Sequence, residues 1–90
     1  MRSRVVASSR TQDHVIALCD AEGHFYVART SADAPALGTR LRGNGPKLGF
    51  GLLLGEAMDA VYRVNFEAVR CGADQALQAL QARPGQDLQH

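Results

Sequence analysis

A strict alternation of apolar and polar residues in YRVNFEA, residues 62–68, constrains the fold of this chain most strongly. A period of two is typical of a strand with one buried face, and its β-branched and aromatic residues also favour a strand. Glycines stand just upstream, at positions 49, 51 and 55. Each would cost a helix interior about 1 kcal/mol relative to alanine, whereas a strand uses glycine at a bulge or bend. We therefore expect two strands, about 50–56 and 60–69, joined by the turn EAMD.

A helix over residues 48–70 is the alternative interpretation. Four charged residues share one side at helical spacing, which is a genuine helical signal: Glu56, Asp59, Arg63 and Glu67. Both interpretations stay open at this point, and the strand pair is preferred because of the glycines and the alternation.

A hairpin is expected nearer the N-terminus. HVIALCD (14–20) and HFYVARTS (24–31) are rich in strand-forming residues and are joined by a short link that ends in Gly23. Gly23 would supply the positive φ that such a loop needs. On the second strand, Phe25 and Val27 should face one way, and Tyr26 and Ala28 the other.

One helix is expected at the C-terminal side, over ADQALQALQA (73–82), with Asp74 as its cap and Pro84-Gly85 as its stop. Ten residues do not hold a helix alone in water, so this helix must dock on the strands. Its apolar stripe contains Leu77 and Leu80.

The chain of 90 residues is long enough for one small domain. We expect an α+β fold: an antiparallel, SH3-like open barrel of four to five strands, with the helix covering an open end. Residues 1–11 are expected to be a mobile basic arm or the lead-in to an edge strand, residues 12–83 the globular domain and residues 84–90 a frayed tail. The expected core comprises Val15, Ala17, Phe25, Val27, Leu41, Leu53, Val61 or Tyr62, Val64, Phe66, Leu77 and Leu80.

Charge is distributed unevenly although the net charge is only +1. No acidic residue occurs between Asp33 and Glu56, and that gap contains Arg40, Arg42 and Lys47. These three cations could contact phosphates or carboxylates, and Phe50 could offer a stacking face. The sequence therefore predicts a partner-binding loop made of Arg40, Arg42, Lys47 and Phe50.

Catalytic, cofactor and metal motifs are not evident. GNGPKLGFG (43–51) lacks the Ser or Thr that follows Lys in a phosphate-binding P-loop, so its glycines are better explained by a bent backbone. Cys19 and Cys71 form no CxxC pair and are expected to be reduced and buried. His14 and His24 could face each other across the hairpin, but no third metal ligand is apparent. We expect no enzyme, no cofactor and no metal.

Residues 38–69 resemble the CarD-type and related Tudor-like modules of bacterial transcription proteins. The resemblance rests on the Gly49-Phe50-Gly51 bend, the strand at 52–54 and the pattern Tyr-x-Val-x-Phe at 62–66. It covers about a third of the chain and implies a partner-binding barrel without catalysis, whose partner is RNA polymerase or another nucleic-acid machine.

The leading hypothesis is thus a non-enzymatic adaptor that binds a protein or nucleoprotein partner, with direct nucleic-acid contact as one form of it. The alternatives are a structural protein that self-associates, for example as a homodimer through an exposed strand edge, and a small-ligand or nucleotide-binding module that uses the glycine-rich loop. No stretch is long and apolar enough for a signal-peptide core or a membrane span, so a cytoplasmic location without membrane contact is expected.

Overall fold

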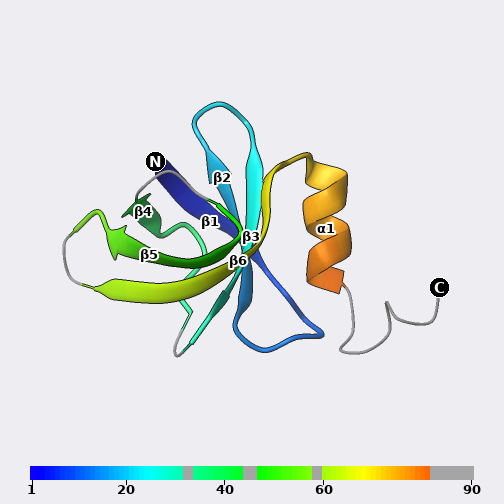
Figure 1. Ribbon diagram of the computed structural model, residues 1–90, viewed down its shortest axis with the longest axis horizontal. Helices are drawn as coiled ribbons and strands as arrows, with labels where there is room; N and C mark the ends of the chain where they lie inside the picture. Colours follow the sequence, from blue (N-terminus) through cyan, green and yellow to red (C-terminus); the bar gives the residue numbers. More distant parts are fainter. Residues whose placement is uncertain (32–33, 44–46, 58–59, 82–90) are drawn as a thin grey trace.

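The protein folds into a small antiparallel β-barrel with one helix at its C-terminal side (Figure 1). The computed structural model describes residues 1–31, 34–43, 47–57 and 60–81. In chain order the elements are β1 (Arg2–Ser8), β2 (Val15–Asp20), β3 (Phe25–Thr30), β4 (Arg40–Gly43), β5 (Gly49–Gly55), β6 (Val61–Cys71) and α1 (Ala73–Gln81).

The six strands form a closed barrel in the order β1-β2-β3-β6-β5-β4, and β4 pairs with β1 to complete the ring. Every pairing is antiparallel. The barrel is therefore confirmed, but the expectation of an open barrel with four to five strands was wrong. Closure removes the unpaired strand edges that an open barrel would present.

The additional strand is β1, within the segment expected to be a mobile arm. Arg2 and Arg4 are exposed, while Ser3 and Val5 are buried in the barrel wall. This is the period-two pattern of a strand, but it extends over only four residues and half of them are arginines. The segment becomes a strand because it pairs with β2 on one side and β4 on the other. The expected tail, residues 84–90, lies outside the described residues.

The two strands expected at 50–56 and 60–69 are confirmed as β5 and β6. Two glycines of β5 have distinct roles. Gly49 has a positive φ of 97°, which favours glycine. At Gly51 an added Cβ would lie 2.8 Å from Cε2 of Phe66, so a side chain there would clash. The ring of Phe66 thus packs directly over the Gly51 backbone. The helical interpretation of 48–70 fails because these glycines serve close packing inside a sheet.

The barrel interior is filled by side chains from all six strands. Nine buried residues form this cluster: Val5, Ile16, Leu18, Tyr26, Ala28, Leu41, Leu53, Val64 and Phe66. Leu41, Leu53, Val64 and Phe66 were expected in the core. Val61 and Tyr62 were expected as alternatives for one core position: Val61 is 61% exposed, and Tyr62 is half-buried against the cluster.

A second apolar cluster lies outside the barrel, between its wall and α1. Its buried members come from β2, β3, the end of β6 and the helix: Val15, Ala17, Val27, Cys71, Ala76 and Leu80. The helix therefore covers the outer face of the wall, and the expectation that it would cover an open end of the barrel was wrong. Leu80 is 5% exposed, whereas Leu77, also expected in the core, is 52% exposed and faces away.

The β2–β3 hairpin contributes side chains to both apolar clusters. Gly23 has the expected positive φ of 87°. Phe25 and Val27 contact the outer cluster while Tyr26 and Ala28 lie in the barrel, as the alternation predicted. Buried residues run unbroken from Val15 to Leu18, because one face of this strand packs inside the barrel and the other under the helix.

Candidate binding surface

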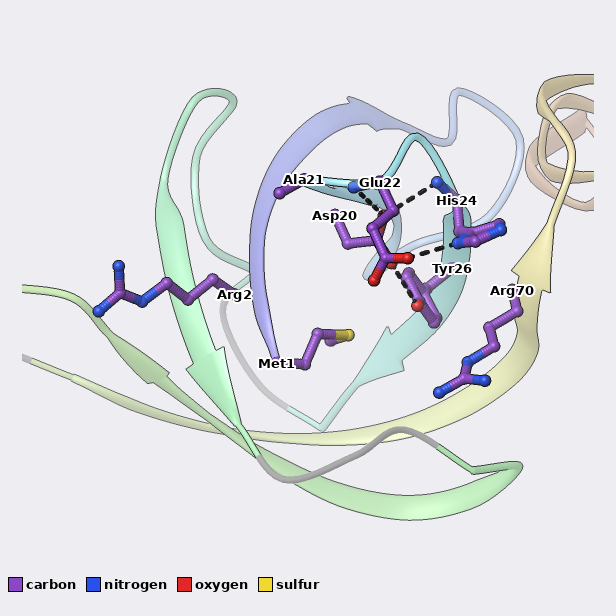
Figure 2. A pocket seen from close by; sticks show the side chains of 8 residues that line it. All are labelled: Met1, Arg2, Asp20, Ala21, Glu22, His24, Tyr26 and Arg70. Atoms are coloured by element: carbon purple, nitrogen blue, oxygen red, sulfur yellow. Dashed lines mark hydrogen bonds and ion pairs between the residues drawn. The ribbon is translucent and has the colours of Figure 1, made fainter.

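A pocket of about 370 Å³ opens where the turn between β2 and β3 meets the end of β6 (Figure 2). Four of its side chains are charged or titratable members of the hairpin, and two more are arginines from β1 and β6. The lining residues are Met1, Arg2, Asp20, Ala21, Glu22, His24, Tyr26 and Arg70.

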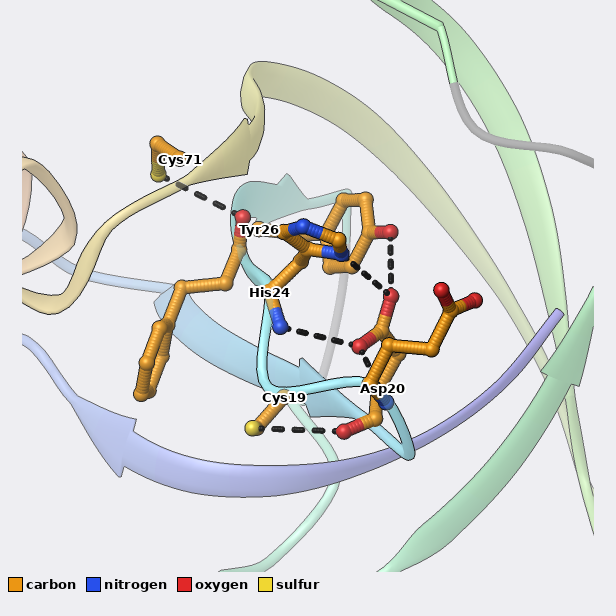
Figure 3. Close-up of polar contacts among 7 residues, drawn as sticks. Cys19, Asp20, His24, Tyr26 and Cys71 are labelled. Atoms are coloured by element: carbon orange, nitrogen blue, oxygen red, sulfur yellow. Dashed lines mark hydrogen bonds and ion pairs between the residues drawn. The ribbon is translucent and has the colours of Figure 1, made fainter.

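Asp20 is the polar centre of this pocket (Figure 3). Its Oδ1 accepts hydrogen bonds from the backbone N–H groups of Glu22 and His24, each at 2.9 Å. Its Oδ2 accepts a 2.7 Å hydrogen bond from the Tyr26 hydroxyl and lies 3.7 Å from Nδ1 of His24. One carboxylate thus ties the tight turn to the barrel interior, an arrangement that aspartate side chains commonly form in turns.

The pKa values follow from these contacts. Burial alone would raise the pKa of Asp20, but hydrogen bonds from Tyr26 and from the backbone N–H groups of His24 and Glu22 outweigh burial and lower the pKa. Burial and the hydrogen bond to Asp20 raise the pKa of Tyr26 to about 12, against an opposing effect of Arg70. Asp20 is therefore ionised and Tyr26 neutral across the physiological range.

Arg70 reaches this pocket from an irregular part of β6. Its φ of 47° is positive, which is uncommon for a residue other than glycine. The β3–β6 register slips nearby, since Phe25 pairs with Cys71 while Val27 pairs with Ala68. A bulge of this kind redirects a side chain out of the regular alternation, and Figure 2 shows Arg70 directed toward Tyr26.

The histidines do not meet. Asp20 and His24 flank the hairpin turn, whereas the His14 carbonyl accepts a hydrogen bond from the Thr30 N–H at the far end of the same hairpin. The idea that His14 and His24 face each other was therefore wrong, because the turn is centred three residues later than their midpoint. Among the residues that the structure describes, no group of three His, Cys, Asp or Glu side chains could hold a metal ion.

The two cysteines are free. Cys71 is buried under α1, as expected, and its Sγ donates to the Phe25 carbonyl at 3.3 Å. Cys19 is only half-buried, and its Sγ donates to the Asp20 carbonyl at 3.4 Å. The Ser9 hydroxyl donates a hydrogen bond to the Leu80 carbonyl and so caps the end of α1.

The main concentration of positive charge lies on the outer face of the β1–β4 pair. Arg2 lies directly opposite Arg42, and Arg4 directly opposite Arg40. All four side chains are exposed, and directly opposed residues bring their Cβ atoms within about 5 Å of each other. We call Arg2, Arg4, Arg40 and Arg42 the arginine face.

These four arginines form no ion pair within the described part of the chain. Arg29 shows the contrast: this exposed cation on β3 donates from Nε to Glu67 at 3.1 Å. Glu56 follows β5 beside Arg40 and lines a shallow hollow of about 450 Å³ with three arginines of the face and Cys19. The arginine face is thus a local concentration of positive charge, and its guanidinium groups have no carboxylate partner among the described residues.

The structure separates Phe50 of the predicted loop from Arg40 and Arg42. Arg40 and Arg42 stand on β4, a strand and not a loop. Lys47 is exposed ahead of β5. Phe50 is 70% exposed but pairs with Asn65 of β6 and lines a different hollow, of about 310 Å³, with Arg63 and Ser31. Phe50 is therefore not adjacent to Arg40 and Arg42.

Arg2 and Arg4 were not among the predicted site residues, although a signal for their position was present. RSR (2–4) and RLR (40–42) carry the same Arg-x-Arg spacing, which puts both arginines on one face of each strand. Recognising the first motif required treating the N-terminal segment as a strand.

Within the described residues, no helix has the length and apolar character needed to cross a membrane. No protein-family model, curated protein or solved structure matches this chain.

Proposed function

We propose that this barrel is a non-catalytic binding module that takes an anionic macromolecular partner on the arginine face. The carrying observation is the register that sets Arg2 opposite Arg42 and Arg4 opposite Arg40 without a carboxylate pairing with any of them in the described residues. Like charges directly opposed on a sheet are destabilising. Two such pairs side by side therefore do not serve the stability of the fold, and their retention is explained by binding of a partner.

Arginine suits this role chemically. Its planar guanidinium can form two parallel hydrogen bonds with a carboxylate or phosphate, and these charge-assisted bonds are stronger than neutral ones. Four guanidinium groups on two adjacent strands present several such forks on one surface. Lys47, exposed ahead of β5, extends the same positive region in our proposal.

The resemblance of residues 38–69 to CarD-type and Tudor-like modules supports a more specific form of this proposal. In that form the barrel is SH3-like, resides in the cytoplasm, and docks on transcription machinery or another nucleoprotein complex. The supporting features are the bend at Gly49-Phe50-Gly51 and the β5–β6 strand pair that follows it.

Affinity capture with matched variants tests the proposal. The tagged wild-type protein is compared with Arg42→Glu and with Arg10→Glu, an equal charge change beyond the other end of β1. We expect wild type and Arg10→Glu to retain the same partner from a lysate of the host, and Arg42→Glu to retain it at least about tenfold less strongly. Nuclease treatment separates a protein partner from a nucleic acid. An empty wild-type eluate, or equal retention by Arg42→Glu, would contradict the proposal.

Self-association is a second candidate, favoured by exposed apolar side chains on β5. Pairing of strand edges is not the route that we propose for it, since each described strand of the closed barrel pairs with a neighbour on both sides. Two copies would instead meet face to face, and a mass that rises with concentration in sedimentation would support this candidate. Repulsion between two arginine faces opposes it in a symmetric dimer.

A further inference from the structure

An apolar stripe runs along the outer face of the barrel wall beside the arginine face. It consists of Phe50, Leu52 and Leu54 at alternate positions of β5, together with Val61 of β6, and their exposed fractions are 70%, 49%, 48% and 61%. The outer face of β2 and β3 also carries apolar side chains, but α1 packs against them. Within the described residues, no element covers the stripe.

The strand register joins the stripe to the arginine face. Val61 pairs with Leu54, Leu54 with Arg42, and Arg42 with Arg2. These four residues form one row across β6, β5, β4 and β1, at about 4.8 Å per strand. Half of the row is apolar and half is cationic, so a ligand that lies across it meets both kinds of surface within about 15 Å.

We infer that the partner is a protein segment that combines carboxylates with aliphatic side chains, an acidic amphipathic segment bound across this row. This inference rests on the proposed function and names the partner class. Aspartate or glutamate side chains would pair with Arg42 and Arg2, while the apolar side of the segment covers Leu54 and Val61. An amphipathic helix presents both kinds of side chain on adjoining faces about 10 Å across, which matches the row.

The aliphatic character of the stripe favours a protein over a single-stranded nucleic acid. Sequence-tolerant nucleic-acid binding relies on aromatic side chains on which bases stack. Three of the four stripe residues are aliphatic, and the one aromatic residue, Phe50, lies farthest along β5 from Arg42. Leucine and valine gain from covering by other apolar side chains, and arginine supplies the preference for an acidic segment.

The test is a selection from a random-peptide display library on the full chain, followed by affinity measurements with the selected peptides. Leu54→Ser probes the stripe. Leu77→Ser is its matched control, because Leu77 is an equally exposed leucine on α1. Leu54→Thr, which keeps a strand-forming residue at this position, guards against a folding defect, and thermal unfolding checks each variant.

We expect enriched peptides to combine acidic and aliphatic residues at helical spacing. They should bind wild type and Leu77→Ser equally, and both Leu54 variants about tenfold more weakly. No enrichment, enriched peptides without acids or without aliphatics, or unchanged binding to the Leu54 variants would overturn the inference. Tighter binding of a single-stranded oligonucleotide or of anionic vesicles would overturn it in favour of those partners. Loss with Arg42→Glu but not with Leu54→Ser removes this inference alone, whereas no loss with Arg42→Glu also removes the proposed function.

Discussion

The Tyr26 hydroxyl donates a 2.7 Å hydrogen bond to Oδ2 of Asp20 and joins the tip of a surface hairpin to the centre of the barrel. Tyr26 is 2% exposed and its ring meets Phe66 edge to face, with centroids 6.4 Å apart. Asp20 in turn holds two backbone N–H groups of the turn. The β2–β3 turn, which lines the pocket of Figure 2, is thereby tied to the core.

Tyr26→Phe should lower the free energy of unfolding by about 1.5–3 kcal/mol, the usual worth of a hydrogen bond to a charged group. The ring and its packing remain, so the loss isolates the hydroxyl. Urea unfolding at neutral pH measures it. Tyr62→Phe is the matched control, because Tyr62 is half-buried on β6 and forms no hydrogen bond through its hydroxyl within the described residues. An equal loss in both variants would contradict the assignment.

Acid should remove the stabilisation that Asp20 provides. The pKa of Asp20 in the folded protein lies below its ordinary value of 3.8, so the folded state binds fewer protons at this group than the unfolded state. Its contribution is present above pH 3.8 and is lost as the pH falls through the lower, folded pKa. Unfolding free energies measured from neutral pH to below pH 3.8 should fall less steeply in Asp20→Asn than in wild type. Asp13→Asn, the same change at an exposed turn, is the matched control, and identical pH profiles of the two variants would contradict the assignment.

Removing Leu80 should weaken the docking of α1. Leu80→Ala is expected to lower the free energy of unfolding by about 2–4 kcal/mol, because it removes a buried side chain and leaves a cavity against the barrel wall. Leu77→Ala, three residues earlier on the exposed side, should change stability by no more than about 0.5 kcal/mol. Denaturant unfolding of the two variants compares them directly. Similar losses would mean that the helix is not held by this face.

Gly51 should not tolerate a side chain while Phe66 is present. Gly51→Ala places a Cβ 2.8 Å from Cε2 of Phe66 and is expected to cost about 1–3 kcal/mol through overpacking. In the double variant with Phe66→Leu the clash is relieved, so its loss should be smaller than the sum of the single losses. A double-mutant cycle measures this coupling. Strict additivity would show that the glycine is needed for another reason.

Several features follow from the sequence because they depend on local signals. The alternation over 62–68 indicated β6, the strand-forming runs around Gly23 indicated the hairpin, and the alanine- and leucine-rich run at 73–82 indicated α1. Each depends on a period or a turn residue within a few positions. These signals do not say which strands pair across the sheet. At the N-terminus, pairing with β2 and β4 is what makes residues 2–8 a strand.

The candidate site shows the same limit. Arg40 and Arg42 were singled out from a gap in acidic residues, but Arg2 and Arg4 join them only through the register of β1 with β4. Phe50 was grouped with them because it is near in sequence, yet it faces a separate hollow. Residues on one strand move apart by about 3.3 Å for each position that separates them in the sequence. Strand pairing, in contrast, brings residues that are far apart in the sequence within about 5 Å of each other.

The sequence by itself determined the predominance of strands, the hairpin, the C-terminal helix and the unequal distribution of positive charge. The tertiary structure decided the closure of the barrel, the side on which the helix packs, and the assembly of the arginine face. The physical reason is that periodicity and turn chemistry act over neighbouring residues, whereas closure and strand register depend on the joint packing of the whole core. The row from Val61 to Arg2 exists only because the first strand of the chain pairs with the fourth.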